Sequence, residues 1–393
     1  MPKLTHWLRE YRVAAAVSMA GTILSLYLHL CNSWSPLVMK AADWTVKLDA
    51  HLTWYPFKIR LLQTYTAIGV SELLGISTKW AFYGTQYVLA FILALLFFRY
   101  LRKLEFSVPW ANFGVSLLVL SLPILAAHFE PIHTWDDIWV YIFLVLSFGA
   151  IVERHWLAAG VFFTLGCFAR EQTLFFYPLL LLGAWQDRRL INRRTLVISL
   201  LMPIVVFGIY FAAMWENPVA ARWSCYEYNF STPARTADSV VSLINSFGFL
   251  WVVAAFGLVR RASHFRDRAA NVVFWGALYA VPLTTVFATL FTLVRETRIL
   301  FPPFLFVFPL ALWELQPLAH AWRDRLSRRG KVLSVFLLVA LAALGFAAAK
   351  WFWPALDFTG SVEVRRNYAG ISLGLSAAFL VAWLYERRLR SHA

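Results

Sequence analysis

The sequence has little of what a water-soluble protein uses to face solvent. Only 15% of its 393 residues are charged, whereas soluble globular chains average about 25%. Apolar residues make up 60% of the chain and aromatic residues 17%, which is more than a single soluble core of this size can bury. The composition therefore excludes a water-soluble enzyme and predicts that lipid surrounds most of the chain.

Cysteine is also scarce. Cys31, Cys167 and Cys225 form neither a C-x-x-C pair nor a spacing typical of a zinc site. The sequence strings typical of nucleotide-binding loops and zinc proteases are missing as well. We therefore predict no disulfide framework, no metal and no cofactor.

Long uncharged runs dominate what is present. A bilayer core about 30 Å thick needs roughly 20 helical residues. Eight runs are close to this length, at 13–39, 80–98, 106–129, 195–215, 239–259, 269–294, 332–349 and 367–385. Four shorter runs also count as spans if a polar end is buried in protein: 138–152, 156–169, 172–185 and 299–313. The prediction is an all-α polytopic membrane helix bundle with about 12 transmembrane helices, a single integral membrane domain over 1–393.

The basic residues predict the topology. If the N-terminus is cytoplasmic, 23 of the 36 Lys and Arg residues fall on the inner side, as the positive-inside rule requires. Anionic lipid headgroups then account for the net charge of +15, and no nucleic-acid partner is expected. Both termini are predicted to be cytoplasmic, with outer loops at 32–79, 127–137, 215–238 and 352–366.

The first outer loop, 32–79, carries acids that stand apart from the basic anchors. Apolar residues recur there at intervals of three and four, which predicts an amphipathic helix on the membrane surface. Asp43 lies between Lys40 and Lys47 at ion-pair spacing, whereas Asp49 has no basic residue three or four positions away. Asp49 is therefore the better candidate for a general base.

A second outer loop brings together two histidines and two adjacent acids. His128, His133, Asp136 and Asp137 have side chains that can bind a sugar or a metal, although their spacing matches no standard metal-ligand set. The alternative is that Thr134 or Asp136 caps the next helix and complements its dipole. The pattern leaves both interpretations open.

Two similar strings place arginine beside glutamate between apolar runs, first at Arg170 and Glu171 and again at Arg295, Glu296 and Arg298. The runs around the first pair are too short to span fully, so this pair is predicted to lie inside the bundle. A buried guanidinium needs a partner, and its planar fork suits a carboxylate or a phosphate. The strings thus indicate either an internal ion pair that holds the bundle together or a site for an anionic ligand.

One G-x-S-x-G string occurs at 370–374, within the last apolar run. It lacks the strand-to-helix turn that exposes a nucleophilic serine in hydrolases. Its two glycines are instead predicted to let two helices pack closely.

Several of these features together resemble a known superfamily. The acid before aromatic residues in the first outer loop, the acidic second loop and the strings A-R-E-Q-T and R-E-T-R-I-L-F-P are similar to bacterial polytopic membrane proteins of the GT-C glycosyltransferase superfamily. The resemblance extends over most of residues 13–315. It implies a GT-C-like fold, a polyprenyl-phosphate sugar as donor and a catalytic carboxylate in the first outer loop. That role falls on Asp49, with Asp43 second.

The resemblance also implies roles for the other polar residues. Those that bind the donor phosphate are Arg170, Arg295 and Arg298, those that support them are Glu171, Glu296, Asp136 and Asp137, and those that bind the acceptor are Trp54 and Tyr55. The expected activity is inverting sugar transfer on the periplasmic side of the bacterial inner membrane. Membrane lipids are the other expected partners, and the oligomeric state is left open.

Two other functions fit the same spans. A transporter or flippase of a lipid-linked or anionic substrate uses intramembrane charges to move a molecule, but such carriers usually bind near the midplane between related halves. Here the unusual charges lie towards the outer ends of the runs. A scaffold subunit whose ion pairs are only structural is the third possibility.

Overall fold

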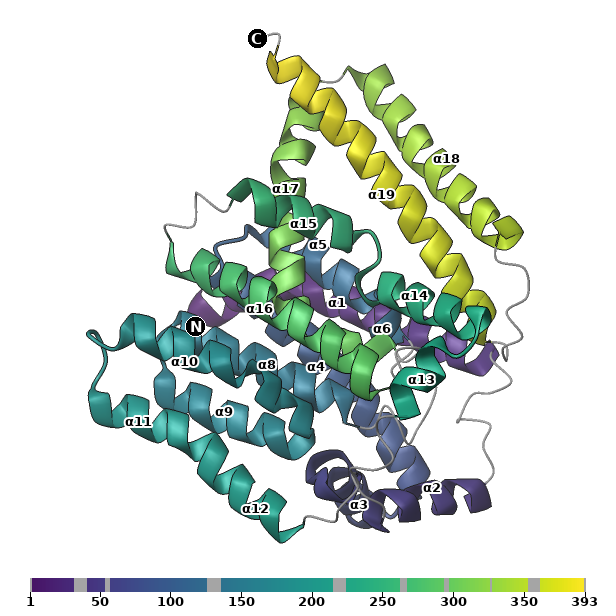
Figure 1. Cartoon of the computed structure of the whole chain (residues 1–393). Coiled ribbons are helices and arrows are strands. Elements are labelled where there is room, and N and C mark those ends of the chain that lie inside the picture. Colours follow the sequence, from purple (N-terminus) through teal and green to yellow (C-terminus); the bar gives the residue numbers. More distant parts are fainter. Residues whose placement is uncertain are drawn as a thin grey trace.

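The computed structural model describes residues 2–31, 41–53, 57–125, 136–214, 224–261, 267–292, 297–325, 327–352 and 361–391. Within these ranges every regular element is a helix and no strand occurs, as the all-α prediction requires (Figure 1). The first half contains α1 (Pro2–Cys31), α2 (Ala41–Thr53), η2 (Phe57–Ile59), α3 (Leu61–Leu74), α4 (Thr78–Lys103), α5 (Val108–Val119), α6 (Leu122–Leu125), α8 (Asp137–Val152), α9 (Trp156–Ala169), η3 (Glu171–Phe176) and α10 (Tyr177–Asp187).

The second half continues with helices that include most of the long apolar runs. Its elements are α11 (Arg193–Met202), η4 (Pro203–Phe207), α12 (Gly208–Ala213), α13 (Ser224–Phe230), α14 (Pro233–Phe247), α15 (Leu250–Arg261), α16 (Arg268–Phe291), η6 (Thr297–Leu300), α17 (Phe304–Arg325), α18 (Arg328–Phe352) and α19 (Ser361–Ser391). Among the described residues, six helices are long and apolar enough to cross a membrane, or seven if one bent pair is a single span. The chain is therefore a polytopic helical bundle.

Two of the four short apolar runs form helices close to their predicted bounds, 156–169 as α9 and 138–152 as α8. The run 172–185 is divided between η3 and α10, and the run 299–313 between η6 and α17. The run 106–129 was wrongly predicted as one helix, because α5 ends at Val119 and α6 covers only Leu122–Leu125 before residues outside the described ranges. Hydropathy indicates that the residues of this run are apolar, but it does not indicate where the helix ends and a new one begins.

The run 239–259 is also broken, and here the cause is visible. Helices α14 and α15 meet at an angle of 65° around Gly248, whose φ of 57° is favourable only for glycine. A side chain at this position would also approach within 2.8 Å of the Ser372 hydroxyl of α19. The run 239–259 therefore forms two helices bent at Gly248, which qualify together as one broken span.

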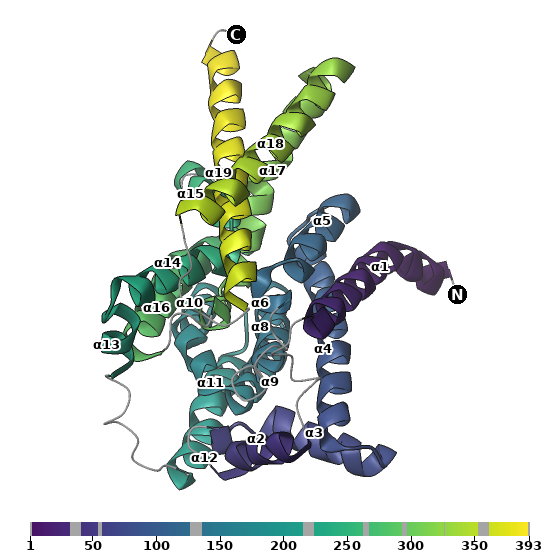
Figure 2. The same cartoon turned by 90° about the vertical axis from the view of Figure 1, so that its right-hand side faces the viewer.

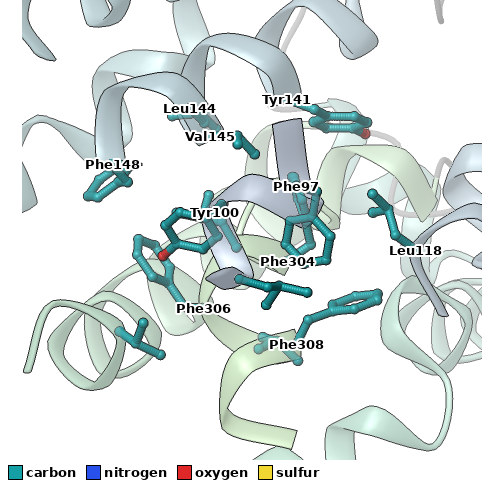
Figure 3. Close-up of a cluster of buried hydrophobic side chains, with 14 of the residues drawn as sticks. Phe97, Tyr100, Leu118, Tyr141, Leu144, Val145, Phe148, Phe304, Phe306 and Phe308 are labelled. Carbon is teal, nitrogen blue, oxygen red and sulfur yellow. The ribbon is translucent and has the colours of Figure 1, made fainter. Parts of the chain in front are cut away.

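The core lies between α4, α8 and α17 (Figure 3). Its aromatic side chains meet across these helices, with Phe97 and Phe304 at a ring distance of 5.4 Å and Phe148 and Phe306 at 5.0 Å. Tyr141 joins the core by its ring and donates a hydrogen bond from its hydroxyl to the Arg298 carbonyl at 3.0 Å. Because lipid is as apolar as these side chains, close packing rather than exclusion of water holds such helices together. The core thereby supports the segment that carries Arg298.

Helices α18 and α19 form a hairpin that projects away from the rest of the bundle (Figures 1 and 2). Their contact is made by glycines: Gly345 of α18 packs on Gly370 of α19, and Gly374 packs on the Leu341 carbonyl. The predicted use of the G-x-S-x-G glycines in helix packing is thus confirmed. An added methyl group at Gly374 would collide with backbone atoms, which cannot move aside as a flexible side chain can.

We expect Gly374→Ala to destabilise the protein by about 1–3 kcal/mol, the usual cost of overpacking. The matched control is Gly84→Ala in α4, where an added methyl meets nothing within 4 Å, and where alanine favours the helix by about 0.5–1 kcal/mol. Thermal unfolding of both variants in the same detergent measures the difference. Equal melting temperatures for the two variants would show that the hairpin contact is not tight.

Candidate functional site

Five of the charged residues predicted as site residues lie at one end of the hairpin formed by α8 and α9. A three-residue turn joins these helices, and the Ser147 hydroxyl of α8 donates to the Ala159 carbonyl of α9 at 3.0 Å. The start of α8, at Asp136 and Asp137, therefore lies beside the end of α9, at Arg170. A carboxylate at a helix N-terminus and a cation at a C-terminus both complement the helix dipole, which favours this arrangement locally.

Asp137 brings two arginines together. Its Oδ1 accepts from Nη1 of Arg170, and its Oδ2 accepts from Nη1 of Arg298 at 2.7 Å. All three side chains are buried. Arg298 lies on η6, which two prolines end before α17 begins at Phe304. Two of the three predicted phosphate-binding residues, which would otherwise repel each other, are thus held on one carboxylate.

Arg60 forms the second half of the cluster. Its Nε and Nη2 donate to the two carboxylate oxygens of Glu171 at 3.1 and 2.8 Å, and its Nη1 lies 3.5 Å from Oδ2 of Asp136. Arg60 is buried at the start of α3, between the apolar residues Ile59 and Leu61. No role is predicted for Arg60 from the sequence. A single arginine between apolar residues is the signal that could have marked it, because a buried guanidinium needs a partner.

The cluster therefore has two halves of opposite net charge. We define the positive half as Arg170, Arg298 and Asp137, and the negative half as Arg60, Asp136 and Glu171. Each half has one unit of net charge if all groups are ionised. The internal ion pairs that the sequence offered as an alternative to ligand binding are present. Within the described residues, however, Arg170 donates a hydrogen bond from Nη1 and from no other side-chain nitrogen.

Burial and neighbouring charges set the ionisation of the negative half. Burial raises the pKa of Asp136 to about 7, although Arg60 and Arg170 oppose this rise. Burial also acts to raise the pKa of Glu171, but the adjacent Arg60 overrides it and lowers that pKa to about 2. Burial alone would lower the pKa of Arg60, yet Glu171 and Asp136 raise it above its ordinary value. Arg60 and Glu171 thus stay ionised, while Asp136 titrates near neutral pH.

Two buried polar atoms, one in the cluster and one beside it, have no hydrogen-bond partner among the described residues. They are Oδ1 of Asp136 and Nε2 of Gln63, and both side chains are buried. Asp136 occupies the N-cap position of α8 but makes no side-chain cap hydrogen bond. The capping role considered for its carboxylate is therefore wrong, because the side chain contacts Arg60 instead. Thr134 lies outside the described residues.

Of the other predicted site residues, the structure describes the side chain of Asp49 alone. Asp49 is exposed on α2, and Asp43 belongs to the same helix, although its side chain is outside what the structure describes. Trp54, Tyr55, Arg295 and Glu296 also lie outside the described residues.

Helix α2 is nevertheless attached near the cluster through His51. The His51 ring lies 3.1 Å from the Thr64 hydroxyl of α3 and 5.0 Å from the Phe57 ring. The guanidinium of Arg60 lies over that Phe57 ring at 5.3 Å. The Phe57 ring therefore lies between His51 of helix α2 and the buried Arg60, and it contacts both.

A second ion cluster, centred on Asp187, lies at the opposite end of the α8–α9 hairpin and serves as a comparison. There Oδ1 of Asp187 accepts from Arg268 and lies 3.6 Å from Nε of Arg154, while Oδ2 accepts from the Trp156 indole at 2.9 Å. Both oxygens of this buried carboxylate are used. No group of three or more residues able to hold a metal occurs in the described part of the chain.

The raised pKa of Asp136 predicts a dependence of stability on pH. Because the native pKa of about 7 exceeds the ordinary value of 3.8, the folded protein holds this proton more tightly, and stability falls as the pH rises through this interval. Between pH 6 and pH 8 the loss is about 1.4 kcal/mol. The lowered pKa of Glu171 contributes stability that is lost only as the pH falls towards 2, so it does not vary in this window.

Thermal unfolding at pH 6 and pH 8 tests this dependence. The wild type should melt at a lower temperature at pH 8, and Asp136→Asn should remove most of that difference. A difference of the same size in both proteins would assign the titration to other groups.

Comparisons of the chain with protein-family models, curated proteins and solved structures give no match.

Proposed function

We propose that this protein is a membrane glycosyltransferase of the GT-C type that moves a sugar from a polyprenyl-phosphate donor to an acceptor. The proposal places about twelve spans in the bacterial inner membrane, both termini in the cytoplasm and the cluster on the periplasmic side. The observation that carries it is the positive half of the cluster, where Asp137 holds Arg170 and Arg298 side by side. This half places two guanidinium groups on one carboxylate, and within the described part of the chain Arg170 donates from Nη1 alone.

A polyprenyl phosphate is a leaving group that departs as an anion. It needs no proton from a general acid, but it needs positive charge where negative charge accumulates. Paired arginines in a site shielded from water supply that charge, and their planar forks match the oxygens of a phosphate. The donor's lipid tail lies among the helices in this proposal, so that only its headgroup reaches the cluster.

The transfer itself is a single displacement. The acceptor oxygen bonds to the anomeric carbon as the bond from that carbon to the phosphate oxygen breaks, and its electron pair leaves with the polyprenyl phosphate. The acceptor hydroxyl loses its proton to a carboxylate, which the resemblance identifies as Asp49. The configuration at the anomeric carbon is inverted.

The test is release of polyprenyl phosphate in proteoliposomes supplied with a panel of polyprenyl-phosphate hexoses and pentoses, with host envelope material as acceptor. Arg170→Gln and Arg298→Gln should each lower kcat/KM by at least tenfold, since each removes charge from the site of the leaving group. The matched control is Arg189→Gln, an exposed arginine between α10 and α11, which should behave as the wild type. If the polyprenyl-phosphate sugar carries a label, movement of this label across the bilayer without release of polyprenyl phosphate would favour a transporter instead.

A further inference from the structure

The unpartnered atoms of Asp136 and Gln63 lie between the same two helix starts. Arg60 and Gln63 are three residues apart at the start of α3, and Asp136 and Trp139 are three residues apart at the start of α8. Arg60 contacts Asp136, while the Trp139 indole donates to Oε1 of Gln63 at 2.9 Å. These contacts form two adjacent rungs between the two helices. Gln63 and Asp136, which each have one atom without a partner among the described residues, therefore belong to neighbouring contacts of α3 with α8.

The orientation of the Gln63 amide follows from its partner. An indole nitrogen can only donate a hydrogen bond, so the atom that accepts from Trp139 must be the amide oxygen. The remaining nitrogen of Gln63 is a donor without an acceptor among the described residues, and Oδ1 of Asp136 is an acceptor without a donor there. Buried polar atoms are rarely left in this state without a ligand or an ordered water molecule to complete them.

A hydroxyl group complements such a pair, because its oxygen accepts one hydrogen bond while its proton is donated in another. We propose that Gln63 and Asp136 bind the acceptor hydroxyl group and that Asp136 is the base that removes its proton. This inference rests on the proposed sugar transfer and specifies its acceptor side. The proton moves from the acceptor oxygen to Oδ1 of Asp136. The acceptor oxygen then forms a bond to the anomeric carbon. The bond from that carbon to the phosphate oxygen breaks, and its electron pair stays on the phosphate oxygen.

The other carboxylates of the cluster are less suited to this role. Both oxygens of Asp137 accept from arginines, and both oxygens of Glu171 accept from Arg60. Asp136 alone among these three has an oxygen without a hydrogen bond from a described residue. The predicted base Asp49 is exposed on α2, whereas Asp136 is buried beside the two arginines Arg60 and Arg170.

The charges around Asp136 favour proton transfer near neutral pH. The groups that act on it are Arg60, Arg170, Asp137 and Glu171, and burial raises its pKa to about 7. A base with a pKa near the working pH combines a useful ionised fraction with a useful affinity for the proton. Adjacent positive and negative halves would thus place the leaving phosphate beside the arginines and the incoming hydroxyl beside the carboxylate.

The experiment measures turnover of the purified full-length protein with the same panel of polyprenyl-phosphate sugars, with water as the attacking hydroxyl, so that no acceptor needs to be known. Asp136→Asn should lower kcat about 10²–10⁴-fold and leave the KM for the donor nearly unchanged. In the wild type kcat should rise with an apparent pKa of about 7, and this titration should be lost in the variant. Gln63→Leu should lower kcat without moving that pKa. Glu72→Gln, an exposed position on α3, is the control.

Three results would overturn the inference, and they separate it from the proposed function. If Asp136→Asn is folded and retains wild-type kcat while Asp49→Asn is inactive, the base is Asp49 and the proposed transfer stands. If Asp136→Asn loses activity but the wild type shows no titration near pH 7, Asp136 has a structural role. If the wild type releases no polyprenyl phosphate from any donor, the proposed function fails and this inference fails with it.

Discussion

Asp137→Asn is expected to destabilise the protein by about 3–5 kcal/mol, the usual cost of removing one partner of a buried ion pair. The asparagine has nearly the same shape, so the change removes charge and leaves packing intact. Arg170 and Arg298 then remain buried beside each other without the carboxylate that both contact. Denaturant unfolding in detergent measures this loss, and sugar transfer should be lost with it.

The neighbouring Asp136→Asn is the matched control for that experiment. Among the described residues its carboxylate pairs with Arg60 alone, at 3.5 Å, and Arg60 keeps its two hydrogen bonds to Glu171. At pH 8 we expect this variant to be at least as stable as the wild type. Adding Arg298→Met to Asp137→Asn should recover part of the lost stability, because it removes one of two adjacent like charges. Equal stabilities for Asp137→Asn and Asp136→Asn would contradict the bridging role of Asp137.

Arg60→Met is expected to cost a similar amount, about 3–5 kcal/mol. Methionine can fill part of the space but leaves Glu171 and Asp136 without their shared cation. The pKa of Glu171 should rise towards or above 4.5 in this variant, because the lowering effect of Arg60 is gone. The variant should therefore gain stability relative to the wild type as the pH is lowered from 8 to 5.

A double variant separates charge from packing at this position. Arg60→Met with Glu171→Gln removes both the cation and the carboxylate that it neutralises, so it should be more stable than Arg60→Met alone by a measurable coupling energy. Unfolding of the four proteins in the cycle at pH 8 provides that energy. A coupling of zero would mean that the hydrogen bonds between Arg60 and Glu171 contribute no net stability.

The sequence predicted five of the six charged residues of the cluster, all but Arg60, but it did not predict which of them pair. The short runs beside Arg170 indicated that its side chain is buried, and it is. The partner of Glu171 lies 111 residues away at Arg60, and Arg298 is 161 residues from Asp137. Such separations leave no periodic signal, because they depend on how the helices pack rather than on the residues next to each charge.

The same distinction explains which helices were predicted well. Helix α9 coincides with its apolar run because a turn at 153–155 and the polar residues at 170–171 bound it on both sides. The break between α14 and α15 depends on one glycine and on Ser372 of a distant helix. A hydropathy pattern contains no information on that tertiary contact.

The central claim is that Arg170 and Arg298 bind a phosphate headgroup. The most direct measurement is native mass spectrometry of the purified protein titrated with polyprenyl monophosphate and with the polyprenol of equal length. We expect the phosphate lipid to bind at least tenfold more tightly than the alcohol, a difference of about 1.4 kcal/mol, and Arg170→Gln with Arg298→Gln to abolish this preference. Equal binding of the two lipids to the wild type, or an unchanged preference in the double variant, would contradict the central claim.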